Sequence, residues 1–79
     1  MSYMFEVYLV YPSDPDDERA ITAIAEKHGG VLDYRHEIHV DSIHTVELTY
    51  DFADESSAQL AEKEVQSAGY HTEGVGPYG

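Results

Sequence analysis

The 79-residue chain contains no cysteine, and this absence excludes several chemistries at once. Without thiols there can be no disulfide framework, no thiolate metal centre and no cysteine nucleophile. The hydrophobic core of so small a domain must therefore stabilise the fold without covalent help. A reducing compartment is consistent with this composition.

A basic leader and a long apolar run are also missing. The first six residues carry no Lys or Arg, and no later segment is apolar for long enough to span a bilayer. The sequence therefore predicts neither a signal peptide nor a membrane span, and we expect a cytoplasmic protein.

Cationic side chains are scarce as well. Four Lys and Arg residues stand against 16 Asp and Glu residues, so the formal net charge is −12 at pH 7. Such a surface repels phosphate backbones and anionic membranes, and it attracts basic partners at low salt. The composition thus disfavours direct binding of nucleic acid or a membrane and favours a basic protein partner. Adaptation to high salt explains the same acidic coat equally well.

Alternating apolar and polar residues predict three long strands, and capping residues predict two helices. The expected strands cover residues 4–11, 31–40 and about 44–52, with a short fourth strand from Tyr70; the expected helices cover about 15–28 and 55–68. This β-α-β-β-α-β order predicts an α+β fold, the ferredoxin-like two-layer plait, with an antiparallel sheet and both helices on one face. We expect a single domain over residues 1–79, with a flexible tail at about 74–79 that is too rich in Gly and Pro to extend the sheet far.

The pattern also predicts a core and a hairpin register. The expected core residues are Phe5, Val7, Leu9, Ile21, Ile24, Leu32, Ile38, Val46, Leu48, Leu60 and Val65. Pairing of opposite charges favours a register with Arg35 opposite Glu47, which leaves a loop of about five residues from His39 to Ile43.

The sheet face without helices is expected to be acidic and to bind the partner. Its carboxylates would pair with Lys and Arg side chains, while a tyrosine would supply contact area. The expected partner-binding residues are Glu6, Tyr8, Asp33, Glu37, Glu47 and Asp51. An RNA-recognition surface on this fold needs several aromatics and a basic rim, and neither is present.

Metal and catalytic sites have little support in the sequence. His39 and His44 can approach at the hairpin end beside Asp41, but this set lacks a complete ligand geometry, so we expect no tight metal site and no cofactor. The serines stand at turns and helix caps and show no nucleophile motif. We therefore expect a protein that is not an enzyme.

Two segments carry a resemblance to a known family, namely Ala25 to Tyr34 and Tyr50-Asp51-Phe52-Ala53-Asp54 through Ala68-Gly69-Tyr70. In these segments the chain resembles the ribonuclease E activity regulator B family, small acidic ferredoxin-like proteins that bind a nuclease. In size and charge it is similar to phage-encoded anti-CRISPR inhibitors, many of which mimic nucleic acid. Both resemblances imply a non-enzymatic inhibitor of a basic nucleic-acid-binding protein.

Two other function classes remain open. One is a small-ligand or metal-binding sensor domain that pairs as a homodimer through a sheet edge or face. The other is a structural domain whose acidity is an adaptation to salt.

Overall fold

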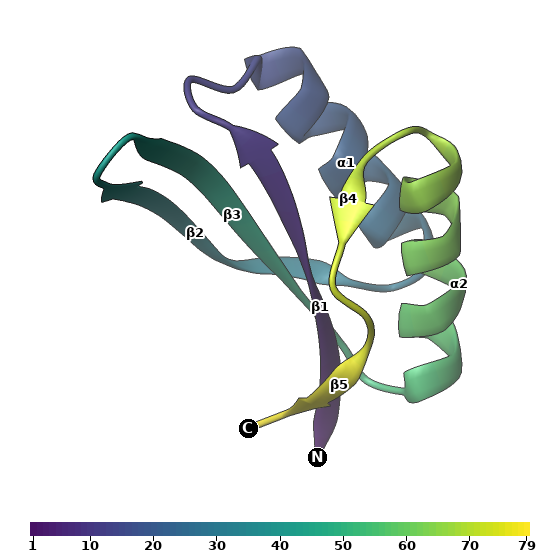
Figure 1. Cartoon of the computed structure of the whole chain (residues 1–79). Helices are drawn as coiled ribbons and strands as arrows, with labels where there is room; N and C mark the ends of the chain where they lie inside the picture. The colour runs from purple at the N-terminus through teal and green to yellow at the C-terminus, as the bar shows by residue number, and fades with distance from the viewer.

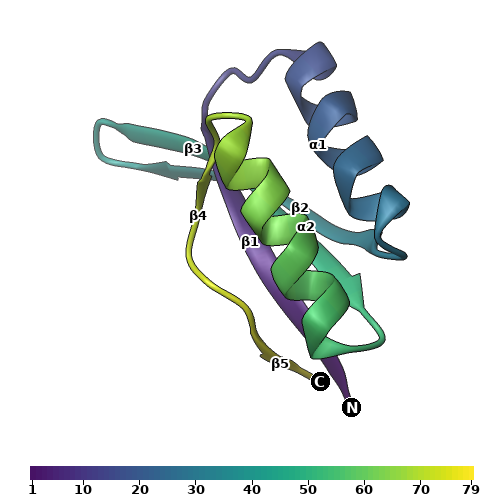
Figure 2. The ribbon, with the colours of Figure 1, turned by 90° about the vertical axis from the view of Figure 1, so that its right-hand side faces the viewer.

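A computed structural model describes all residues from 1 to 79. The fold is α+β, with five strands in one antiparallel sheet and two helices. In chain order the elements are β1 (Ser2–Val10), α1 (Pro15–Lys27), β2 (Val31–Val40), β3 (Ile43–Phe52), α2 (Glu55–Ser67), β4 (His71–Thr72) and β5 (Gly76–Tyr78). The strand order is β2-β3-β1-β4, with β5 also paired to β1 (Figure 1). Both helices lie on the same side of the sheet (Figure 2).

Aspartate caps fix the start of both helices. The Asp14 carboxylate accepts a hydrogen bond from the backbone N–H of Asp16 at 2.8 Å, and Asp54 does the same for Ser57 at 2.8 Å. Each cap satisfies a backbone donor that the first helical turn leaves unpaired. The predicted helix starts are therefore confirmed. Neither helix is long and apolar enough to cross a membrane.

The core lies between the helices and the two central strands. Its buried side chains are Phe5, Val7, Ile21, Ala25, Val46, Leu48, Tyr50, Phe52, Ala58, Ala61 and Val65. Leu9 and Ile24 pack against this cluster and are partly buried. The core prediction is therefore confirmed for most of its members.

Three residues of the predicted core lie outside it. Leu60 is 59% exposed, because α2 buries the face that carries Ala58, Ala61 and Val65. Leu32 is 41% exposed and Ile38 is only half-buried. Both belong to β2, the outermost strand, in which no side chain is buried. Ile38 also pairs with Thr45 and so projects away from the helices.

The hairpin register predicted from charge is wrong. The structure joins β2 and β3 by a two-residue turn, with Val40 paired to Ile43, and it sets Arg35 opposite Leu48 and His36 opposite Glu47. A β-bulge between Leu32 and Tyr34 shifts the register of everything that follows in β2. The turn is tight because Asp41 takes a positive φ of 54°, a conformation that Asp tolerates better than most residues.

Residues after Gly74 extend the sheet by one short strand. β5 pairs with the start of β1, so that Tyr78 lies opposite Ser2 and Gly76 opposite Met4. The Ser2 hydroxyl also donates a hydrogen bond to the backbone oxygen of Tyr78 at 2.9 Å. Gly and Pro are tolerated here because β5 is an edge strand of only three residues.

Gly30 is required by close packing after α1. A Cβ at this position would overlap the ring of Phe52, which is only 2% exposed. We expect Gly30→Ala to lower the free energy of unfolding by about 1–3 kcal/mol, because a buried ring has no space to move into. Urea denaturation measures the loss. Gly76→Ala is the control, since no atom lies within 4 Å of a Cβ there; equal losses at the two positions would contradict the packing argument.

Candidate partner-binding face

The pairing register decides which side chains lie on the sheet face without helices, here called the open face. Directly paired residues in an antiparallel ladder project to the same side. The pairs Phe5–Tyr50 and Val7–Leu48 are buried against the helices. The alternate pairs therefore project to the open face, as Glu6 does opposite Thr49 and Tyr8 opposite Glu47.

Two carboxylates of neighbouring strands meet on the open face. A hydrogen bond to the Glu6 carboxyl, with burial and the charge of Glu6, raises the pKa of Glu47 to about 7. The Tyr8 hydroxyl donates a hydrogen bond to Oε1 of Glu6 at 2.9 Å. Burial, this hydrogen bond and the surrounding charges raise the pKa of Tyr8. The three side chains thus form one connected group that gains a negative charge near neutral pH.

Asp51 belongs to the same face and has an unsatisfied acceptor. It lies opposite Met4 of β1 and opposite Val31 of β2. Its Oδ1 atom is buried and has no hydrogen-bond partner in the chain. Buried polar atoms are usually paired, so this oxygen is an exception within the fold.

Tyr78 links the last strand to Asp33 on β2. Its hydroxyl donates a hydrogen bond to Oδ2 of Asp33, and this bond raises the pKa of Tyr78, with the charges of Asp51 and Glu6 acting in the same direction. Tyr78 shares the open face with Ser2, its paired residue. No local pattern in the sequence indicated this role of Tyr78, because the contact depends on the pairing of β5 with β1.

Glu37 lies on the helix side, so its expected place on the open face is wrong. It pairs with Val46, a core residue. Arg35 donates hydrogen bonds to Oε1 of Glu18 on α1 and to Oε2 of Glu37, both at 2.8 Å. The β-bulge is the cause, because one extra residue exchanges the two faces of the strand.

All four Lys and Arg residues belong to the helices or point toward them. Arg19 and Lys27 lie on α1, Lys63 lies on α2, and Arg35 is bound to Glu18. Arg19 pairs with Asp16, and Lys27 pairs with Glu64 at 2.5 Å. The open face therefore carries carboxylates and no Lys or Arg.

The predicted histidine pair does come together at the hairpin end. The Nδ1 atoms of His39 and His44 are 2.8 Å apart, and the ring of Tyr11 packs edge-on against His39 with centroids 4.6 Å apart. No group of three or more His, Asp or Glu side chains is arranged to hold a metal ion. Asp41, the third candidate, lies in the turn itself.

We expect calorimetric titration with Zn²⁺ or Ni²⁺ to show nothing tighter than weak micromolar binding. Two imidazoles leave the remaining coordination positions to water, which gives little affinity. Any weak signal should disappear in His39→Ala and persist in His28→Ala, since His28 instead bonds Glu64 at 3.0 Å. Nanomolar binding would contradict this reading of the pair.

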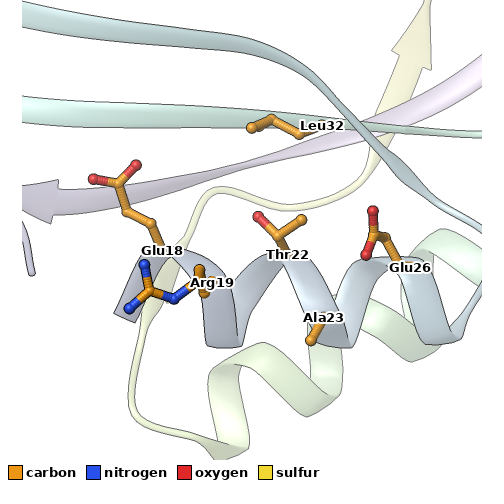
Figure 3. A pocket seen from close by; sticks show the side chains of 6 residues that line it. All are labelled: Glu18, Arg19, Thr22, Ala23, Glu26 and Leu32. Atoms are coloured by element: carbon orange, nitrogen blue, oxygen red, sulfur yellow. The ribbon is translucent and has the colours of Figure 1, made fainter. Parts of the chain in front are cut away.

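A shallow cleft of about 420 Å³ lies between α1 and β2. Figure 3 shows Leu32 of β2 facing the α1 side chains across it. The lining residues are Glu18, Arg19, Thr22, Ala23, Glu26 and Leu32. The hydrogen bond from Arg35 lowers the pKa of Glu18, and the Thr22 hydroxyl is bonded to that of Tyr50 at 2.8 Å. Both groups are therefore already engaged within the protein.

No model of a known protein family matches the chain, and no curated protein matches it significantly. The resemblances to the ribonuclease E activity regulator B family and to anti-CRISPR inhibitors therefore stay predictions.

The charge of the open face should depend on pH near neutrality. The pKa of Glu47 is raised, so the folded state binds this proton more tightly than the unfolded chain does. The stabilisation that protonated Glu47 contributes to the folded state is fully present below about pH 4.5. This contribution is lost as the pH rises through about 7.

We therefore expect the free energy of unfolding to fall by about 1 kcal/mol more in the wild type than in Glu47→Gln between these pH values, after allowance for solvent screening of a partly exposed pair. Urea denaturation at several pH values measures the difference. Glu26→Gln on α1 makes the same chemical change outside the group and serves as control. Parallel pH profiles for wild type and Glu47→Gln would argue against a shared proton.

Proposed function

We propose that this chain is a non-enzymatic acidic binding protein that occupies the nucleic-acid site of a basic protein. The observation that carries the proposal is the one-sided charge of the open face. Glu6, Glu47 and Asp51 lie there, and every Lys and Arg belongs to the other side. Carboxylates fixed on a sheet present negative charge to a basic channel much as phosphates do.

One further feature supports a protein partner for this face. Tyr8, held by its bond to Glu6, offers a rigid ring of the kind that anchors interfaces.

We infer that the arrangement is the ferredoxin-like plait. The β-α-β-β-α-β order of the first six elements and the strand order β2-β3-β1-β4 support this inference. In such a fold the helices cover one face of the sheet, so the other face is the natural place for a partner. Among basic partners, the resemblances favour a nuclease or a CRISPR effector.

Capture followed by competition tests the proposal. The immobilised protein should retain a basic nucleic-acid-binding protein from host lysate, and labelled duplex DNA or RNA should displace that partner once it is purified. The complex should also weaken as salt rises, because surface charges are screened beyond about 8–10 Å at ordinary ionic strength. A partner that binds this protein and nucleic acid together would refute mimicry and favour solvation as the role of the acidity.

The cleft between α1 and β2 favours a second candidate function, the binding of a small ligand. Its free carboxylate, Glu26, and its apolar floor, Leu32, suit a small cation with an apolar body. Titration with an alkyl diamine, followed by NMR shifts at Thr22 and Ala23, tests this candidate. Unchanged resonances at millimolar ligand would exclude that ligand class.

A further inference from the structure

β2 is a long strand with a free edge. It spans ten residues, lies outermost in the sheet and pairs only with β3 (Figure 1). The opposite edge is formed by β4 and β5, which have two and three residues. Apolar side chains of β2 are unusually exposed, at 52% for Tyr34 and 56% for Val40. A free edge of this kind is a template for another strand.

The charges on this edge are mixed rather than protective. Proteins commonly shield a free edge with charges that repel a second strand. In an otherwise acidic chain, β2 carries Arg35, the one Lys or Arg found in any strand, with Glu37 two residues later. Arg35 bonds Glu18 and Glu37 of its own chain. Its spacing of two residues from Glu37 also sets Arg35 against Glu37 when the strand pairs with a second copy of itself.

We propose that two copies of this chain form a dimer by antiparallel pairing of their β2 strands, centred on His36. In this register Arg35 lies opposite Glu37 of the second copy, and Tyr34 lies opposite Ile38 of the second copy. Two-fold symmetry repeats both contacts. Opposite charges and an aromatic–aliphatic pair are the cross-strand contacts that stabilise sheets.

Neighbouring registers are disfavoured by charge. A centre shifted by one residue places Arg35 opposite Arg35 of the second copy, or Glu37 opposite Glu37 of the second copy, and like charges in direct opposition are destabilising. The bulge between Leu32 and Tyr34 interrupts the ladder on one side. The paired segment is therefore Tyr34 to Ile38.

The dimer is independent of the proposed function and compatible with it. A two-fold axis perpendicular to the sheet places the helices of both copies on one side and both open faces on the other. Each copy carries a net charge of −12, so long-range repulsion opposes association and salt relieves it. The dimer should strengthen with salt, whereas the complex with a basic partner should weaken.

Sedimentation of the wild-type protein gives the first test. We expect the dimer fraction to rise between about 0.1 M and about 2 M KCl, as the screening length falls from about 10 Å to below 3 Å. A monomer at both salt concentrations, at high protein concentration, would overturn the proposal. This measurement needs no variant, and its failure would leave the competition experiment on the open face unaffected.

Single cysteines test the register, because the chain has no thiol of its own. His36→Cys should form a disulfide-linked dimer under mild oxidation, since symmetric residues at the centre lie about 4.5–5.5 Å apart between Cα atoms, within reach of a disulfide. Tyr34→Cys is the matched control on the same strand and face. Its two thiols would be displaced by four residues, about 13 Å, and should not cross-link.

Both side chains are exposed, so both variants should keep the fold, which circular dichroism checks. Fast cross-linking of His36→Cys alone supports the register. Equal or faster cross-linking of Tyr34→Cys would overturn it.

Discussion

Reversing Glu6 and Glu47 together to lysine is expected to weaken the complex with the basic partner by about 30- to 100-fold. Both side chains project from the open face, where no Lys or Arg offsets them. Loss of a charge from a close interfacial pair typically costs about 2–5 kcal/mol, and a reversal adds repulsion, while screening by salt reduces the effect. Surface plasmon resonance at low and high salt measures the change.

The control for this reversal is Glu26→Lys on α1. It makes a comparable reversal on the helix side, and its side chain is exposed. We expect this variant to lower affinity only slightly, through the change in net charge. The double variant reverses two charges and Glu26→Lys reverses one. If Glu26→Lys lowers the binding free energy by half as much as the double variant, binding depends on net charge alone and the open face is not the interface. Glu37 is unsuitable as a control, because it lies beside Arg35 at the β2 edge.

Replacing Leu48 by alanine should lower the free energy of unfolding by about 2–5 kcal/mol. Leu48 is fully buried on β3, opposite Val7 of β1. The substitution removes its transfer free energy and leaves a cavity that the surrounding core fills only in part. For a domain of this size, the loss is a large fraction of the total stability. Urea denaturation with an unchanged m-value measures it.

Leu60→Ala is the matched control for this substitution. Leu60 is 59% exposed on the outer side of α2, so its truncation should cost well under 1 kcal/mol. The two substitutions remove the same atoms, one set from the core on β3 and the other from the exposed side of α2, where alanine also favours the helix. Equal destabilisation at the two positions would mean that the outer face of α2 is covered.

Local signals in the sequence located the elements well. Asp14 and Asp54 were recognisable as caps because a short polar side chain before an amphipathic run satisfies the first helical N–H groups. Alternation in β1 and β3 assigned Val7 and Leu48 to the core and Glu6 and Glu47 to the opposite face. These signals involve only a few neighbouring residues, so they can be recognised without knowing which strand pairs with which.

Features of the candidate site that involve two strands could not be predicted from the sequence. The sequence placed Glu6 and Glu47 on one face, but their shared hydrogen bond depends on the diagonal position that the β1–β3 register gives them. The approach of Tyr78 to Asp33 depends on β5 joining the sheet. No local pattern carries either contact, because each joins segments far apart in the chain.

The sequence by itself determined the α+β class, the helix caps, the two central strands and the acidity of the open face. These follow from periodicity and composition, which the chain carries locally. Tertiary structure decided the rest through strand order and one inserted residue. The outer place of β2 leaves Leu32 41% exposed. The bulge before Tyr34 moves Glu37 to the helix side and Ile38 to the open face, because a single extra residue in a strand exchanges its two faces.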